Sequence, residues 1–226
     1  MTKAVIFDID GTLIDSVDLH AEAWVEAFRH FGFTCAFEAV RRQIGKGGDQ
    51  LMPVFLPREV LDSRGEEIER LRSELFKRDY LPKVRPFPGV RPLFEHVRSA
   101  GQTIVLASSG KKDEVERYQE IAGISDLVDE VTSSDDAERS KPYPDIFEAA
   151  LKRIAPLGAA DAVVIGDTPY DAEAAGKAGL STVGVLCGGF PESDLRSAGC
   201  VAIYRDPEDL LRHYDASPLG PRPRQG

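Results

Sequence analysis

The chain of 226 residues lacks several features that mark particular classes of protein. It has only three cysteines, Cys35, Cys187 and Cys200, and their spacing fits neither a metal-binding nor a redox motif. Such cysteines are typical of buried free thiols in a reducing compartment. No apolar run approaches the roughly 20 residues that cross a bilayer, and no cleavable leader precedes the first apolar segment. These absences predict a cytoplasmic protein with no membrane partner.

Positive charge is also scarce. The chain has 28 lysines and arginines against 38 aspartates and glutamates, which gives a formal net charge of −10. This balance disfavours nucleic acid, or an anionic membrane surface, as the main partner. With 42% hydrophobic and 29% charged residues, the composition suits a globular protein.

The most informative stretch lies at the start, where an apolar run from residue 4 to 7 leads into Asp8, Ile9 and Asp10. Valine, isoleucine and phenylalanine in a short run predict a buried strand, and alternation along a strand sends both aspartates to the same side. Two carboxylates this close repel each other unless a cation or a shared proton lies between them. Gly11 and Thr12 follow as a flexible, donor-rich turn that a phosphate could approach. Taken alone, the stretch also fits an ordinary turn that ends a strand.

Residues 17–85 contain no strand-like run, and their apolar spacing predicts helices instead. The first helix begins at residue 17, with Asp15 or Ser16 as the capping residue, and ends at Gly32. Further helices are expected near 37–43, 48–56 and 58–80, before prolines at 82, 86 and 88 interrupt the pattern. We therefore expect residues 16–85 to form a helical insertion.

After residue 88 the pattern changes to alternating helices and strands. Helices are expected at 90–99, 111–121, 144–155 and 170–178, and strands at 102–107, 128–132, 162–166 and 181–186, with a shorter pair at the end. This alternation predicts an α/β fold, a Rossmann-like doubly wound parallel sheet formed by residues 1–15 and 86–216. The tail 217–226, rich in proline and glycine, is expected to be disordered. Ligands of such sheets bind at the carboxyl ends of the strands.

Polar residues follow three more of the predicted strands. Ser108, Ser109 and Gly110 open a helix, whose free N–H groups suit an anion; a serine that only caps the helix is the alternative. Lys141 lies in a loop stiffened by prolines; the alternative is a surface lysine. Asp167 and Asp171 form a second acidic pair after the strand at 162–166, where Asp171 alone could be a first-turn helix acid.

Together these residues provide the groups for one chemistry. The carboxylates of Asp8 and Asp167 and a backbone carbonyl near Asp10 would suit Mg²⁺, which prefers oxygen ligands. Lys141, Ser108 and the loop N–H groups would neutralise a phosphate, so that Asp8 could attack phosphorus to form an aspartyl-phosphate. Asp10 would protonate the leaving oxygen and later activate water.

With these motifs the sequence resembles the haloacid dehalogenase-like hydrolase superfamily over roughly residues 3–205. The resemblance implies that Asp8 is the nucleophile, Asp10 the acid/base and Lys141 the charge partner, with residues 16–85 as a helical C1 cap. It also implies that Ser108 is catalytic and that Thr12 and Asp171 support the site. Dehalogenases in this superfamily lack the second aspartate, so Asp10 indicates a phosphate-directed member.

The cap segment from Gly45 to Met52 resembles the cap loop of phosphoglycolate-phosphatase-like members. Gly45 and Gly47 would let the backbone and the Lys46 ammonium reach a small site, although an exposed lysine in a tight loop fits the same segment. His20 and Trp24 resemble β-phosphoglucomutase instead. That mutase carries a phosphate-binding arginine where this chain has residues 47–49 without one, which favours hydrolysis.

The prediction is therefore an Mg²⁺-dependent phosphatase that hydrolyses a small phosphorylated metabolite, with phosphoglycolate as the first candidate, and that is a monomer or homodimer. The alternatives are a sugar-phosphate mutase, a phosphonatase with Lys46 as its Schiff-base lysine, and a non-catalytic regulatory protein. The metal ligands are expected to be Asp8, Asp10 and Asp167. The residues expected to bind the substrate are His20, Gly45, Lys46, Gly47, Ser109 and Gly110.

Overall fold

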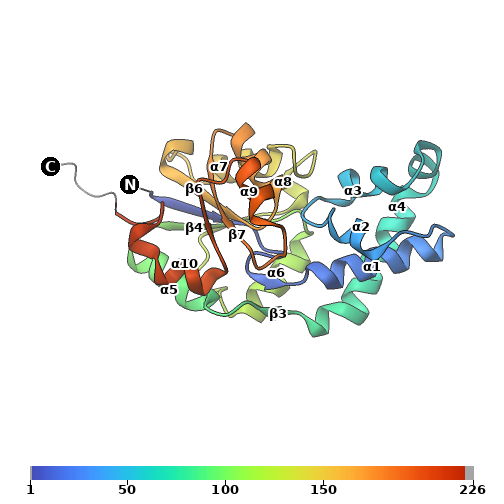
Figure 1. Ribbon diagram of the computed structural model, residues 1–226, viewed down its shortest axis with the longest axis horizontal. Helices are drawn as coiled ribbons and strands as arrows, with labels where there is room; N and C mark the ends of the chain where they lie inside the picture. The colour runs from blue at the N-terminus through green and yellow to red at the C-terminus, as the bar shows by residue number, and fades with distance from the viewer. Residues whose placement is uncertain (1, 222–226) are drawn as a thin grey trace.

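A computed structural model describes residues 2–221 and contains a six-stranded sheet in the order β5-β4-β1-β6-β7-β8 (Figure 1). Each strand pairs in parallel with its neighbours. The strands are β1 (Ala4–Phe7), β4 (Thr103–Ala107), β5 (Glu130–Thr132), β6 (Ala162–Gly166), β7 (Ser181–Val185) and β8 (Ala202–Tyr204). The predicted α/β class and parallel sheet are confirmed.

Helices cover both faces of this sheet, because successive strand residues point to opposite sides. Val5 and Phe7 of β1 belong to the hydrophobic cluster under α5 (Val90–Ser99), α6 (Lys112–Ala122) and α10 (Pro207–Arg212). Ala4 and Ile6 belong to the cluster under α7 (Asp145–Arg153) and α8 (Pro169–Lys177). One further helix, α9 (Glu192–Ser197), lies between β7 and β8 in the chain.

The insertion forms a separate helical group beside one end of the sheet (Figure 1). It comprises α1 (Val17–His30), α2 (Phe37–Arg41), α3 (Gly48–Phe55) and α4 (Arg58–Leu75), and α4 continues as a π-helical turn over Phe76–Tyr80. A cluster of its own, which includes Trp24, Phe28, Leu51 and Ile68, holds these helices together. We call α1–α4 and this turn the cap, and the rest of the described chain the core.

Two short strands join the segments that connect the cap to the core. Ile14–Asp15 (β2) pairs antiparallel with Arg85–Pro86 (β3). The sequence did not predict this pairing, because two-residue strands are too short to show a period-two pattern.

Two local predictions need correction in detail. Ser16 is the N-cap residue of α1, as predicted, but its side chain makes no capping hydrogen bond; its hydroxyl donates to Oδ1 of Asp10 at 2.5 Å. Residues 217–221 lie against the core rather than being disordered, because Leu219 is 1% exposed and its carbonyl accepts a hydrogen bond of 2.8 Å from Gln102 Nε2. The rest of the predicted disordered tail, 222–226, lies outside the described residues.

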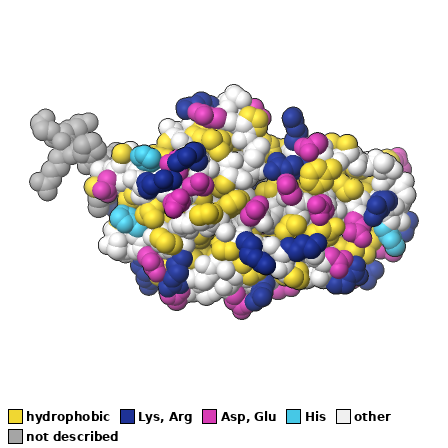
Figure 2. Space-filling view, turned by 60° about the horizontal axis from the view of Figure 1, so that its bottom comes forward, with side chains coloured by type: hydrophobic (Ala, Val, Ile, Leu, Met, Phe, Trp, Pro, Cys, Tyr) yellow, Lys and Arg dark blue, Asp and Glu magenta, His cyan; other side chains and the backbone are white. Residues whose placement is uncertain are grey.

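Neither the surface charges nor the cysteines indicate a particular binding partner. Acidic, basic and apolar side chains are interspersed over the face shown in Figure 2. Cys35, Cys187 and Cys200 are free thiols, half-buried rather than buried. No helix within residues 2–221 has both the length and the apolar composition needed to span a bilayer.

Candidate active site

Asp8 lies directly after β1 at the centre of a buried polar network. Its side chain and that of Lys141 are almost completely buried, and the Lys141 ammonium donates a hydrogen bond to Asp8 Oδ1. The same ammonium lies 2.7 Å from Oδ1 of Asp171. The hydroxyl of Thr12 is 3.1 Å from Asp8 Oδ2 and 3.0 Å from Asp167 Oδ1. The structure thus brings together residues from the ends of two strands and from the loop that carries Lys141.

Asp171 also fixes the start of α8. Its Oδ2 accepts hydrogen bonds from the backbone N–H of Thr168 at 3.0 Å and from the Thr168 hydroxyl at 2.7 Å, while its own N–H donates to that hydroxyl oxygen at 3.2 Å. This reciprocal arrangement is a capping box. One carboxylate therefore orders the helix and holds Lys141 beside Asp8.

Three buried carboxylates form a group that could hold a metal ion. Oxygen atoms of Asp8, Asp167 and Asp171 lie within 4.8 Å of one another. Oδ2 of Asp167 is buried and has no hydrogen-bond partner among the described residues. Gly11 and Gly188 crowd this oxygen so closely that a Cβ on either would approach within 2.3 Å and 1.7 Å of it, and Gly11 has a φ of +83°. The chain thus leaves an unpartnered oxygen in a cradle that only glycine permits, which is consistent with a metal site.

The electrostatics of this group also indicate a missing positive charge. Burial raises the pKa of Asp8 to about 7, against the opposing effect of Lys141. Burial and the neighbouring Asp8 and Asp171 raise the pKa of Asp167 well above its usual value. Burial acts to lower the pKa of Lys141, but Asp171 and Asp8 outweigh it and the net shift is upward. A divalent cation would supply the charge that one ammonium cannot.

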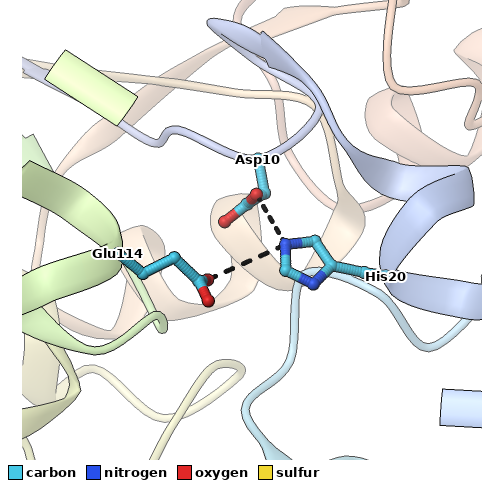
Figure 3. Close-up of side chains that lie close together, drawn as sticks. All are labelled: Asp10, His20 and Glu114. Carbon is cyan, nitrogen blue, oxygen red and sulfur yellow. Dashed lines mark hydrogen bonds and ion pairs between the residues drawn. The ribbon is translucent and has the colours of Figure 1, made fainter. Parts of the chain in front are cut away.

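The side chain of Asp10 points to the cap rather than to the other aspartates. Its Oδ1 lies 2.9 Å from Nε2 of His20 in α1, and the same nitrogen lies 3.0 Å from the hydroxyl of Tyr118 and 3.9 Å from Glu114 Oε1. Figure 3 shows Asp10 from the core loop and Glu114 from α6 converging on the His20 ring. The carboxylate of Asp10 is thus occupied by Ser16 and His20, so a contact from Asp10 to a metal would come from its backbone carbonyl.

This arrangement favours the ionised form of Asp10. Burial alone would raise its pKa, but the charge of a protonated His20 and hydrogen bonds from His20 and Ser16 bring the pKa below its usual value. His20 is stacked on Phe76 at 3.9 Å between ring centroids. His20, predicted as a substrate contact, lines the cavity at Asp8 and also links the cap to the predicted acid/base.

The predicted phosphate-binding segment lies at the end of β4. Ser108 is 1% exposed, and its hydroxyl accepts a hydrogen bond of 3.0 Å from the N–H of Gly110. The hydroxyl of Ser109 is buried without a hydrogen-bond partner among the described residues. Ser109 and Gly110 line the same cavity as Asp8 and Asp10, as predicted for a segment that binds an anion.

The glycine loop of the cap rests directly on the core. A Cβ on Gly45 would lie 2.7 Å from the Thr168 side chain, and one on Gly47 would lie 2.0 Å from Ser140 Oγ. The N–H of Ser140 donates to Oδ2 of Asp49 at 3.1 Å. The cap is thus closed on the core, with the loop against the residue that precedes Lys141.

Lys46 lines the cavity, but its ammonium is engaged within the loop region. It donates to Gln43 Oε1 at 2.6 Å and lies 4.5 Å from the centre of the Tyr170 ring. Burial lowers its pKa, with Glu173 acting in the opposite direction. The sequence did not predict this lowering, because the burial comes from the core and not from the glycine-rich loop.

Sequence reasoning missed Arg72, Glu114 and Tyr118, all of which lie around the site. Arg72 and Glu114 line the cavity, and Tyr118 contacts His20. The sequence did contain a signal for two of them. Arg72 lies four residues after the buried Ile68, and Glu114 lies four residues before the buried Tyr118, so each shares a helix face with a buried residue. A charged residue on an otherwise buried helix face requires a partner or a function.

Comparison with known proteins relates this arrangement to a family. Residues 5–185 match the model described as "Haloacid dehalogenase-like hydrolase". The chain is 30% identical over 203 residues to the probable phosphatase IndB of Dickeya dadantii, covering 88% of this chain and 87% of that protein. It is 29% identical to a phosphorylated carbohydrates phosphatase of Thermotoga maritima, with 92% of this chain and 96% of that protein covered. A phosphoglycolate phosphatase of Rhodospirillum rubrum is 26% identical, with 91% of this chain and 88% of that protein covered.

Solved structures show the same fold. A hydrolase from Pseudomonas syringae is 30% identical and superposes with a TM-score of 0.85, covering 94% of this chain and 98% of that one. A putative β-phosphoglucomutase from Bacteroides vulgatus also gives a TM-score of 0.85 at 24% identity, covering 95% of this chain and 88% of that one. The inserted helical cap is therefore part of an architecture shared by several enzymes.

Proposed function

Because the chain belongs to the haloacid dehalogenase-like hydrolase family, and is thus an enzyme of phosphatase type, we propose that it hydrolyses a small phosphomonoester through an aspartyl-phosphate on Asp8. The observation that carries this proposal is the position of Asp8, buried between Lys141 and Thr12 and lining a cavity closed by the cap. Two relatives, at 30% and 29% identity, are named as a probable phosphatase and as a phosphorylated carbohydrates phosphatase.

In the first step, a carboxylate oxygen of Asp8 attacks phosphorus and the bond to the leaving alcohol oxygen breaks. Lys141 offsets the charge of Asp8 and of the phosphate, while the N–H of Ser109 donates a hydrogen bond to a phosphate oxygen. Asp171 keeps Lys141 in place through the 2.7 Å ion pair. In the second step, water attacks the phosphorus of the aspartyl-phosphate and regenerates Asp8.

Asp10 supplies the proton transfers. It protonates the leaving oxygen in the first step and removes a proton from water in the second. The closed structure, in which His20 and Ser16 stabilise the ionised carboxylate, corresponds to the form required for the second step.

The residues also fit a bound Mg²⁺. The side chains of Asp8 and Asp167 and the backbone carbonyl of Asp10 would hold it, and Asp167 Oδ2 offers an unpartnered oxygen. When bound, the ion would neutralise phosphate charge and orient the ester. Asp171 would remain a partner of Lys141 rather than become a ligand.

The cap-loop sequence makes phosphoglycolate the first substrate to test, and a sugar-phosphate mutase the second function. The mutase receives support from a specific observation: Arg72 provides a cation in the cavity, although residues 47–49 do not. A mutase would convert a hexose phosphate to its isomer when hexose bisphosphate is added, whereas a hydrolase would release phosphate under the same conditions.

The direct experiment is acid-quenched mass spectrometry of the enzyme after mixing with substrate and Mg²⁺. We expect a phosphoryl group on the peptide that contains Asp8, absent in EDTA and absent in Asp8→Asn. The Asp8→Asn protein should fold, because Asp171 still pairs with Lys141, yet it should release no phosphate. Phosphate release within tenfold of wild type by Asp8→Asn would contradict the assignment. A covalent adduct on Lys46 after borohydride treatment would instead indicate the phosphonatase.

A further inference from the structure

The cavity at Asp8 adjoins a second cavity between the cap and the core. The first is about 40 Å³ and the second about 180 Å³. The residues that line both are Gly47, Gly48, Arg72, Ser109 and Glu114. A leaving group attached to a phosphate at Asp8 would meet these residues first.

The residues that line both cavities, which we call the shared wall, include polar atoms that form no hydrogen bond within residues 2–221. Nε of Arg72 and Oγ of Ser109 are buried and have no hydrogen-bond partner among residues 2–221. Most buried polar atoms in proteins are hydrogen-bonded, and leaving one unpaired is costly. An arginine and a serine unpaired at one wall therefore indicate a ligand that completes their hydrogen bonds.

Glu114, in the same shared wall, provides hydrogen-bond acceptors, whereas Arg72 provides donors. Glu114 is 4% exposed, its carboxylate accepts no hydrogen bond within the described chain, and its Oε1 lies 3.9 Å from Nε2 of His20. A ligand group that contacts both side chains must accept a hydrogen bond from Arg72 and donate one to Glu114. A hydroxyl does both, whereas a carboxylate or a second phosphate only accepts and would be repelled by Glu114.

We propose that Arg72, Ser109 and Glu114 form a subsite for a hydroxyl group of the leaving alcohol, so that the enzyme prefers phosphate esters of polyols to those of hydroxy acids. This inference rests on the proposed function and, within its class of small phosphomonoesters, ranks polyol phosphates ahead of the phosphoglycolate that the cap-loop sequence suggests. It also gives a role to Arg72, whose guanidinium lies 5.1 Å from the centre of the Trp24 ring and is held in place by that ring.

Three esters of two carbons test the subsite, because they differ only at the far carbon: ethyl phosphate, 2-hydroxyethyl phosphate and 2-phosphoglycolate. In wild type with Mg²⁺, kcat/KM for 2-hydroxyethyl phosphate should exceed that for ethyl phosphate by about 10- to 100-fold, the effect of a hydrogen bond to a charged group. The kcat/KM for phosphoglycolate should be lower than that for 2-hydroxyethyl phosphate. Equal values for the hydroxyethyl and ethyl esters, or a preference for phosphoglycolate, would overturn the proposal.

Variants then assign the preference to residues. Arg72→Met and Glu114→Gln should each reduce the ratio of kcat/KM between the hydroxyethyl and ethyl esters by about tenfold. Glu114→Gln should also raise kcat/KM for phosphoglycolate relative to that for 2-hydroxyethyl phosphate. Arg70→Met and Glu116→Gln, exposed positions on the same two helices, are the matched controls and should keep the wild-type ratios. Because a ratio between substrates is measured, a general loss of folded enzyme does not imitate the result. Unchanged ratios in both variants would refute the subsite.

The same panel separates the two proposals. Turnover of these esters without a hydroxyl preference refutes only the subsite. Absence of Mg²⁺-dependent turnover for all three esters and for p-nitrophenyl phosphate overturns the proposed function and the subsite with it.

Discussion

The ammonium of Lys141 and the carboxylate of Asp171 form an ion pair of 2.7 Å in which neither side chain is exposed to solvent. Asp171 lies in the first turn of α8, and α7 and β6 separate it in the sequence from the loop of Lys141. The pair therefore links the orientation of the Lys141 ammonium to the folding of a core helix. A fully desolvated charge of this kind depends strongly on its partner.

Asp171→Ala should for this reason destabilise the protein by about 3 kcal/mol or more, since it leaves Lys141 with one fewer counter-charge and removes the cap of α8. Urea unfolding monitored by circular dichroism would measure the loss. Thr168→Val, which removes the capping hydroxyl but keeps the ion pair, should cost only about 1 kcal/mol. Equal losses in the two variants would show that the carboxylate acts as a helix cap alone.

The raised pKa of Asp8 predicts an unusual dependence of stability on pH in the absence of metal. Because its pKa is about 7 in the folded protein and 3.8 in the unfolded chain, the folded state holds a proton that the unfolded state has released between these values. Its contribution to stability therefore decreases as pH rises from about 4 to 7.

Asp8→Asn removes this titration. In EDTA, the free energy of unfolding of the variant relative to wild type should increase by about 1–3 kcal/mol between pH 5 and pH 7.5. The exposed Asp215→Asn is the control and should show no such trend. A difference between Asp8→Asn and wild type that is independent of pH would contradict a raised pKa for Asp8.

Asp10→Asn should distinguish proton transfer from nucleophilic attack. Esters with poor alkoxide leaving groups need protonation, so their phosphorylation of Asp8 should slow by about 10²-fold or more, whereas p-nitrophenyl phosphate should phosphorylate Asp8 nearly as fast as in wild type. Single-turnover measurements separate this step from hydrolysis of the aspartyl-phosphate, which should slow for both esters. If the first step slows equally for both, Asp10 has another role.

Gly47→Ala should prevent the cap from closing. The new Cβ would lie 2.0 Å from Ser140 Oγ and 2.6 Å from Ser140 Cβ, so the loop would have to move away from the residue beside Lys141. We expect kcat/KM to fall by at least tenfold with little change in the melting temperature. Gly65→Ala, in helix α4 of the same cap and with nothing within 4 Å of its Cβ, should keep activity and gain up to about 1 kcal/mol of stability. Activity within twofold of wild type for Gly47→Ala would show that closure does not require this contact.

The sequence was sufficient for the core architecture, because apolar strands and amphipathic helices alternate with clear periods. It was also sufficient to place Asp8, Lys141 and Asp167 near one another, since the carboxyl ends of parallel strands lie at one edge of a sheet. It was not sufficient for contacts between the cap and the core. The engagement of His20 with Asp10 and the position of Arg72 depend on how closely two separate helical surfaces approach, and no local pattern records that distance.

The predicted role of Lys46 illustrates the same limit. Its glycine neighbours predicted that its ammonium reaches a small site; Lys46 does line the cavity, and its ammonium contacts Gln43 and the ring of Tyr170 in the closed protein. Tyr170 comes from the core, in the helix that begins at Pro169, so its contact with the cap loop could not be read from either segment.

The antiparallel pairing of Ile14–Asp15 with Arg85–Pro86 places the point where the chain leaves the core next to the point where it returns. An inserted unit whose two ends are adjacent can be lengthened, shortened or exchanged without altering the order of the strands that carry the nucleophile. Selection for a new substrate can therefore act on the insert while the phosphoryl-transfer groups stay fixed. For protein engineering, this ribbon is the natural junction for grafting a different cap onto the same catalytic core.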